Sequence, residues 1–154
     1  MVAKVKYVHL NLIARDWKRL ADFYTRVFGC VLVPPERDLA GQWLDDATSV
    51  PRAHLRGAHL RLPGYGDAGP TLEIFQYDSE LEKPSTAVNR PGFAHLAFAV
   101  DDVDASRAAV IAAGGHAVGK IVSVEIPGAG AIRFVYVTDP EGNVVELLRW
   151  QKIK

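Results

Sequence analysis

The feature that most constrains this chain is that one pattern of residues occurs in it twice. One set of matched residues is separated by 95 − 9 = 86 positions and consists of the pairs His9 and His95, Asp16 and Asp102, and Gly29 and Gly115. A second set is separated by 146 − 73 = 73 positions and consists of the pairs Gly57 and Gly130, Ala58 and Ala131, Gly69 and Gly142, and Glu73 and Glu146. The difference, 86 − 73 = 13 residues, predicts an insertion between Gly29 and Gly57. A repeat of this kind predicts two equivalent structural modules.

Each copy is predicted to follow the order βαβββ. It opens with an alternating run around His9 or His95, which is typical of a strand with one apolar face. A helix follows, with an aspartate cap and a glycine stop, which are Asp16 and Gly29 in the first copy. Further strands are expected near residues 30–34, 55–62 and 71–77, and near residues 117–125, 131–138 and 143–150. The predicted fold class is α+β, with tandem modules at residues 1–78 and 93–154 and a linker at residues 79–92.

Charge and composition narrow the range of partners. The 18 basic and 18 acidic side chains cancel, which argues against a nucleic-acid or membrane-surface partner. Cys30 is the single cysteine, so an internal disulfide is excluded. The first residues alternate and lack the continuous apolar run of a signal peptide, and we expect a cytoplasmic protein.

Two histidines and two glutamates are predicted to share the sheet face turned away from the helices. Glu73 alternates with apolar neighbours in its strand, as Glu146 does in the corresponding strand of the second copy. A carboxylate buried alone is costly, so two of them, each matched by a histidine, indicate a common partner. The predicted ligands of one Zn²⁺, Ni²⁺, Co²⁺, Mn²⁺ or Fe²⁺ ion are therefore His9, Glu73, His95 and Glu146. The alternative is that these are unrelated positions on a half-exposed sheet.

Four further residues are candidates for substrate binding. By alternation, His59 and Arg61 share one face of their strand, and a cationic Arg61 on the inner face suits a substrate carboxylate or phosphate. If the strand is oriented otherwise, Arg61 lies at the sheet rim in water. Phe134 and Tyr136 are expected either to wall the cavity or to serve as core or dimer contacts.

At these residues the chain resembles the vicinal oxygen chelate superfamily, which includes glyoxalase I, methylmalonyl-CoA epimerase, extradiol dioxygenases and fosfomycin or bleomycin resistance proteins. The similarity covers nearly the whole chain, through the segments VHLNLIARD, LADFYTRVFGC, TLEIFQY, GFAHLAFAVDDVDA and VTDPEGNVVELLRW. It implies that the two modules form a cup-shaped mixed β-sheet, with the helices on the outer face and the metal inside. The ligand set at positions 9, 73, 95 and 146 is similar to the His-Glu-His-Glu set of glyoxalase I.

The resemblance also implies a reaction. A small substrate with two neighbouring oxygens would chelate the metal, which would stabilise an enediolate while a carboxylate moves a proton. Glu146 is then the first candidate for the catalytic base, and Glu73 is the second carboxylate, as ligand or partner base. We therefore expect a glyoxalase-like lyase or isomerase, which acts as a homodimer on a small molecule.

Alternatives remain open within the same family. An extradiol-type ring-cleaving dioxygenase, an enzyme similar to methylmalonyl-CoA epimerase and a non-enzymatic drug-binding resistance protein are each compatible with the resemblance. No counterpart of the glutathione-contacting pattern of glyoxalase I is recognisable. The long connection gives a further expectation, that part of residues 36–54 covers the cup and selects the substrate.

Overall fold

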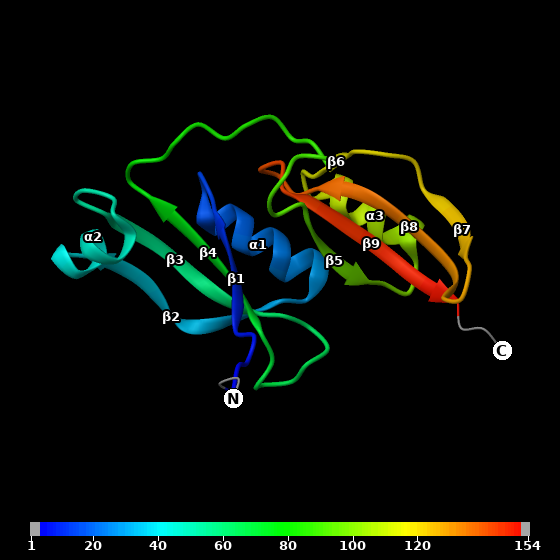
Figure 1. The fold of residues 1–154 in the computed structure, drawn as a ribbon, viewed down its shortest axis with the longest axis horizontal. Coiled ribbons are helices and arrows are strands. Elements are labelled where there is room, and N and C mark those ends of the chain that lie inside the picture. Colours follow the sequence, from blue (N-terminus) through cyan, green and yellow to red (C-terminus); the bar gives the residue numbers. More distant parts are fainter. Residues whose placement is uncertain (1–3, 152–154) are drawn as a thin grey trace. The chain divides into compact units, whose positions relative to one another are not determined.

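A computed structural model describes residues 4–151 of the chain, which divides into two compact units, Met1–Glu82 and Lys83–Lys154 (Figure 1). Each unit is described by itself. The predicted linker at residues 79–92 contributes to both units, and the module boundaries at residues 78 and 93 stay a prediction.

Unit 1 contains a four-stranded sheet and two helices. Its elements are β1 (His9–Ile13), α1 (Trp17–Phe28), β2 (Val31–Ala40), α2 (Gln42–Thr48), β3 (His54–Arg61) and β4 (Thr71–Tyr77). The strand order is β1-β4-β3-β2, in which β1 is parallel to β4 and the other neighbours are antiparallel. The sheet is therefore mixed, and its first strand pairs with its last.

The helix α1 covers one face of this sheet. Its start is set by Asp16, whose side chain accepts a hydrogen bond of 3.0 Å from the backbone N–H of Arg19, and its end by Gly29 at φ 68°. The helix packs against β3 and β4. The buried side chains at this contact are Leu20, Phe23 and Tyr24 from the helix and Ala58, Leu60, Leu72 and Ile74 from the strands. Their partners in alternation, including Glu73, therefore point to the opposite face.

Unit 2 repeats this arrangement with changes. Its elements are β5 (His95–Ala99), α3 (Val103–Ala112), β6 (His116–Ala117), β7 (Val122–Ile126), β8 (Gly130–Thr138) and β9 (Val144–Gln151). The order is β5-β9-β8-β6, β7 also pairs with β8, and β5 is parallel to β9. Asp102 caps α3 through the backbone N–H of Ala105, and α3 packs on β8 and β9. The predicted α+β class and the tandem βαβββ order are confirmed.

Three details differ from the predictions. The strand expected near residues 30–34 continues to Ala40, and the additional helix α2 follows it. The strand expected near residues 117–125 is divided into β6 and β7. The helix α2 escaped prediction because it has seven residues, no side-chain cap and one buried side chain, that of Leu44.

Strand register also corrects the alignment of the two copies. His59 lies across from Glu73, and Tyr136 lies across from Glu146, so equivalent residues of β3 and β8 are separated by 136 − 59 = 77 positions. Gly57 is consequently not the counterpart of Gly130. The 13 extra residues are distributed as 86 − 77 = 9 before β3 and 77 − 73 = 4 in the β3–β4 turn.

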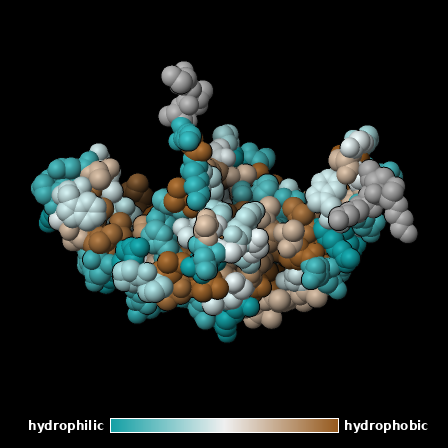
Figure 2. Space-filling model, turned by 90° about the horizontal axis from the view of Figure 1, so that it is seen from below, coloured by the Kyte–Doolittle hydropathy of each residue, from teal (hydrophilic) through white to brown (hydrophobic). Residues whose placement is uncertain are grey.

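The surface is mixed in character. On the side shown in Figure 2, hydrophobic residues form separate patches among polar ones. Among residues 4–151, no helix combines the length and apolar character that crossing a membrane requires.

Candidate metal centre

In unit 1, the carboxylate of Glu73 lies between two imidazoles. Glu73 stands in the middle of β4, and the residue is 9% exposed. Nε2 of His9 lies 3.4 Å from its Oε2, and Nε2 of His59 lies 3.0 Å from its Oε1. Each carboxylate oxygen therefore faces one histidine, one from β1 and one from β3. We call this sheet face, opposite α1, the histidine face of unit 1.

The surroundings of His59 favour a neutral imidazole. Burial lowers the pKa of His59, an effect that the neighbouring Glu73 opposes. Its ring meets the ring of Phe75 edge-on at 5.8 Å between centroids. A neutral imidazole carries one N–H, and with that proton on Nε2 it donates a hydrogen bond to Glu73.

In unit 2, the second predicted pair is also in contact. Nε2 of His95 lies 3.1 Å from Oε2 of Glu146. Tyr136 is the cross-strand partner of Glu146, and its ring lies 5.2 Å from that of His95. Burial, and then the charge of Glu146, raise the pKa of Tyr136, so its phenol stays neutral. We call this sheet face, opposite α3, the histidine face of unit 2.

Within each pair, the separation between the nitrogen and the oxygen suits two ligands of the same metal ion. Two donor atoms about 2.1 Å from one ion lie about 3.0 Å apart at right angles and about 3.4 Å apart at the tetrahedral angle. The observed separations are 3.4 Å for His9–Glu73 and 3.1 Å for His95–Glu146. Imidazole nitrogen and carboxylate oxygen are donors that Zn²⁺, Ni²⁺, Co²⁺, Mn²⁺ and Fe²⁺ accept. Within residues 4–151, no group of three or more His, Cys, Asp or Glu side chains has metal-site geometry, and each unit contributes a pair.

The remaining predicted site residues lie on the same two faces. Arg61 is the cross-strand partner of Thr71, and its guanidinium forms a 2.9 Å ion pair with the exposed Asp67. Phe134 precedes Tyr136 by two positions on β8, and their rings lie 5.8 Å apart. The structure thus brings His59 to Glu73, and Tyr136 to His95 and Glu146.

The insertion before β3 packs on the histidine face of unit 1. Leu44 from α2 forms a small core with Ala53 and Leu55. The partly buried residues packed against this core are Leu39, Val50, Phe75 and Tyr77. By register, Leu55, Phe75 and Tyr77 share the face of Glu73. Part of residues 36–54 therefore covers this face, on the far side of Phe75 from His59.

One charged cluster was not anticipated from the sequence. His54 lies between two carboxylates, with Nε2 2.6 Å from Asp38 and Nδ1 2.6 Å from Asp78, and Arg56 also pairs with Asp78. The hydrogen bonds to Asp38 and Asp78 raise the pKa of His54, and the bond to His54 lowers that of Asp78. No sequence spacing links positions 38, 54 and 78, because strand register alone brings them together.

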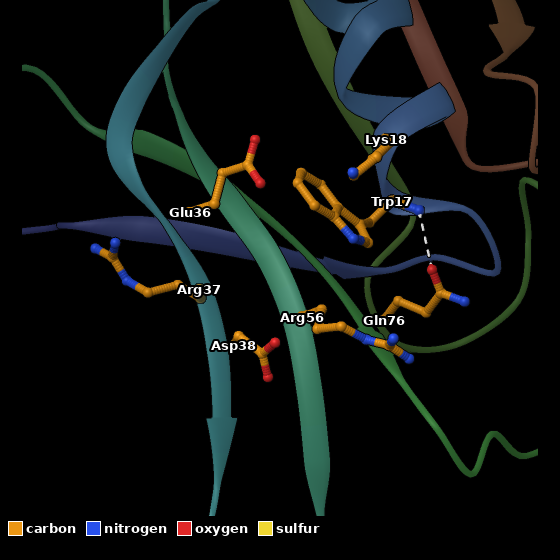
Figure 3. Close-up of a pocket in the computed structure, with 7 residues that line it drawn as sticks. All are labelled: Trp17, Lys18, Glu36, Arg37, Asp38, Arg56 and Gln76. Carbon is orange, nitrogen blue, oxygen red and sulfur yellow. Dashed lines mark hydrogen bonds between the residues drawn. The ribbon is translucent and has the colours of Figure 1, made fainter.

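A cavity of about 330 Å³ in unit 1 lies away from the predicted metal ligands (Figure 3). Its lining includes Trp17 at the start of α1 and the cross-strand partners Arg56 and Gln76, and the backbone N–H of Trp17 donates to Gln76 at 3.4 Å. Arg56 and Gln76 alternate with the residues of the histidine face. The cavity therefore opens on the opposite side of the sheet and contains none of the predicted site residues.

The fold and the paired side chains define a two-module α+β protein in which each module brings the histidine that opens its first strand to a glutamate in its last strand. A sequence model of the Glyoxalase/Bleomycin resistance protein/Dioxygenase superfamily matches residues 6–147, and the chain belongs to this family. The resemblance to the vicinal oxygen chelate superfamily is confirmed.

The individual relatives have low sequence identity to this chain, and their functional descriptions differ. The chain is 29% identical over 143 residues to the uncharacterized protein YaeR of Escherichia coli K12, covering 90% of this chain and 92% of that protein. It is 26% identical over 147 residues to a probable lactoylglutathione lyase of Vibrio parahaemolyticus, covering 94% and 90%.

Solved structures agree with the fold. A glyoxalase family protein from Bacillus cereus superposes with a TM-score of 0.82 at 19% identity, over 99% of this chain and 100% of that one. The fosfomycin resistance protein FosX of Listeria monocytogenes, solved with Mn(II) and sulfate, has a TM-score of 0.54 at 14% identity, over 98% and 95%.

Proposed function

We propose that the protein is a metal-dependent, glyoxalase-like lyase or isomerase, in which His9, Glu73, His95 and Glu146 hold one divalent ion. The observation that carries this proposal is that both units place a histidine and a glutamate at equivalent positions, with separations of 3.4 and 3.1 Å. The family relationship and the manganese in the related FosX structure support it. The probable lactoylglutathione lyase from Vibrio parahaemolyticus supports the lyase assignment.

The substrate would be a small molecule with oxygens on two neighbouring carbons. A bound ion would supply Lewis-acid stabilisation of the negative charge that develops on these oxygens. Glu146 would take the proton from the carbon beside the carbonyl, which produces an enediolate. The protonated Glu146 would then return the proton to the former carbonyl carbon while the hydroxyl proton passes to the neighbouring oxygen, so that the carboxylate is regenerated and the substrate is isomerised.

Glu146 is the preferred base because its environment is less restrictive than that of Glu73. Among residues 4–151, the ion pair of Glu146 is with His95, whereas Glu73 meets His9 and His59. A proton shuttle must change its contacts during turnover, and the additional contact of Glu73 with His59 opposes such a change. Glu73 is then the more permanent ligand and the second candidate base.

The other site residues would bind and select the substrate. Arg61 would exchange its exposed partner Asp67 for a carboxylate or phosphate on the substrate. Phe134 and Tyr136 would provide an apolar wall beside Glu146, and His59 would border Glu73. The segment 36–54 would limit the length of the substrate, since its core packs against Phe75 on the same face.

Metal analysis tests the proposal directly. Wild-type protein reconstituted with Ni²⁺, Co²⁺, Zn²⁺ or Mn²⁺ should bind about one ion per chain, as a single four-ligand set requires. The double variant His9→Ala with His95→Ala should lose that ion, while His116→Ala, which removes an exposed histidine of β6, should retain it. Absence of bound metal in the wild type would overturn the proposal. A screen of 2-oxoaldehyde adducts, acyl-CoA epimers and catechols with each metal would then separate lyase, epimerase and dioxygenase activities.

A further inference from the structure

The two glutamates at equivalent positions have different cross-strand partners. Register places His59 across from Glu73 in unit 1 and Tyr136 across from Glu146 in unit 2. Nε2 of His59 lies 3.0 Å from Oε1 of Glu73 and forms a direct polar contact. Tyr136 instead contacts the ring of His95, at 5.2 Å between centroids. The two units therefore differ at the strand position across from the glutamate. This difference restrains the carboxylate of Glu73 more than that of Glu146.

His59 is itself held in place. Its side chain is 21% exposed, against 44% for the side chain of His9. The ring of Phe75 packs edge-on against it, and Phe75 in turn packs against the core beneath α2. Gly57 faces Phe75 across the strands, and a methyl group at Gly57 would come within 2.5 Å of the Phe75 ring. The packing therefore fixes Phe75, and through it the orientation of the His59 imidazole.

We propose that His59 is a positioning residue that donates its Nε2–H to Oε1 of Glu73 and leaves Oε2, the oxygen facing His9, for the metal ion. This inference rests on the proposed metal site. It makes Glu73 a ligand through one oxygen, with its second oxygen occupied by protein. A hydrogen-bonded carboxylate is oriented before the ion arrives, and partners of this kind contribute about 10- to 100-fold to metal affinity.

In this arrangement His59 is a hydrogen-bond donor to Glu73 and not a fifth ligand of the ion. A ligand role would give unit 1 two histidines and unit 2 one. His59 contacts Oε1, while His9 contacts Oε2, so the two imidazoles approach different oxygens of the carboxylate. With His59 as hydrogen-bond donor, the ligand set remains one histidine and one glutamate from each unit.

Cobalt binding tests this role with two substitutions. Gln places an amide N–H₂ near the position of Nε2, so His59→Gln should keep the Co²⁺ dissociation constant within about threefold of wild type and preserve the visible absorption spectrum. His59→Leu removes the donor and should weaken Co²⁺ binding about 10- to 100-fold while the stoichiometry stays near one. His116→Gln serves as the matched control for loss of an exposed histidine and should bind as wild type does.

The outcomes separate this inference from the function on which it rests. Equal Co²⁺ affinity in wild type and His59→Leu would overturn the positioning role alone. Equal weakening in His59→Gln and His59→Leu, with a changed spectrum in both, would show that His59 is a ligand and would also overturn it. Failure of the wild type to bind Co²⁺ would overturn the metal site and this inference together.

Metal-free protein provides an independent measurement. Long-range ¹H–¹⁵N correlation spectra should show the Nε2–H tautomer for His59 in the wild type, because that nitrogen faces the carboxylate. Glu73→Ala should release this preference, and the spectrum of His116 should stay unchanged. An Nδ1–H tautomer for His59 in the wild type would contradict the proposed hydrogen bond whether or not metal binds.

Discussion

His95 reaches Glu146 diagonally across two parallel strands. The register partner of His95 is Val144, and that of Glu146 is Ala97, yet Nε2 of His95 lies 3.1 Å from Oε2 of Glu146. The imidazole therefore leans along the strand direction toward Glu146, on the sheet face that it shares with Ala97. The same geometry recurs between His9 and Glu73, whose register partners are Thr71 and Asn11. A diagonal histidine–glutamate contact that recurs in both units is a more specific similarity between the units than the sharing of one sheet face.

The first prediction concerns the catalytic base. Glu146→Gln keeps the size of the side chain and one oxygen donor but removes most of its basicity. Turnover should fall about 100-fold or more, the scale of general acid–base catalysis, while metal stays bound, though more weakly. The measurement is solvent deuterium exchange into a substrate analogue, with metal content determined in parallel.

Glu73→Gln is the comparison for this variant. Its exchange should be less affected, because Glu73 is assigned mainly as a ligand. Normal exchange in Glu146→Gln with lost exchange in Glu73→Gln would reverse the two roles. Normal exchange in both variants would remove proton transfer by these carboxylates and favour a dioxygenase or a binding protein.

The second prediction concerns the pH dependence of stability. Because Asp38 and Asp78 raise the pKa of His54 above 6.5, its contribution is fully present below pH 6.5 and is lost as the pH rises through the higher folded value. The pKa of Asp78 is lowered from 3.8, so its contribution is present above that pH and is lost on acidification. The cluster should therefore be most favourable between about pH 4 and about pH 6.5, and its contribution should decline from there to the raised pKa of His54.

Chemical denaturation between pH 3 and 9 checks this window. The difference in unfolding free energy between wild type and His54→Gln should be largest inside the window and should shrink on both sides. Asp38→Asn should reduce the alkaline part of the difference, since one of the two partners of His54 is then neutral. A pH-independent difference would show that the cluster contributes packing alone.

The third prediction concerns the segment over the histidine face of unit 1. Leu44 is 4% exposed and is the buried side chain of α2, so Leu44→Ala should destabilise the attachment of this segment by about 2 kcal/mol or more. Amide hydrogen exchange at residues 42–53 should accelerate, whereas exchange in α3 of unit 2 should not. If the segment selects the substrate, KM should change more for long substrates than for short ones. Unchanged exchange and kinetics would remove the segment from the site.

The fourth prediction concerns the single cysteine. Burial raises the pKa of Cys30 to about 11, so almost none of its thiol is ionised at neutral pH. A thiol reagent such as a disulfide dye should react slowly with the folded protein at pH 7.5 and at once after denaturation. Fast reaction of the native protein would mean that the β2 side of unit 1 opens readily.

Much of the fold follows from local chemistry that the sequence displays. The aspartate caps at Asp16 and Asp102, the glycine stop at Gly29 and the alternation around His9 and His95 are local signals, and each is borne out. The sharing of one face by a histidine and a glutamate within each unit follows from the same period-two pattern. Local periodicity was sufficient for these features because it does not depend on register.

Contacts that depend on register were not predictable in this way. The contact of His59 with Glu73 depends on the β3–β4 turn, which is four residues longer than the β8–β9 turn of unit 2. Because of this difference in length, the alignment that matched Gly57 to Gly130 was wrong. The cluster around His54 requires positions on β2, β3 and the end of β4 to meet. The helix α2 depends on one buried leucine, a tertiary contact without a periodic signal.

The pairing of β1 with β4, and of β5 with β9, has a consequence for synthesis of the chain. The first strand of each unit lacks its hydrogen-bonding neighbour until the last strand has been made. That last strand also carries the glutamate. During translation, the histidine–glutamate pair of each unit can therefore form only when the last strand has been made and pairs with the first. A ribosome-bound chain that ends before β9 leaves His95 on an unpaired strand without its carboxylate partner.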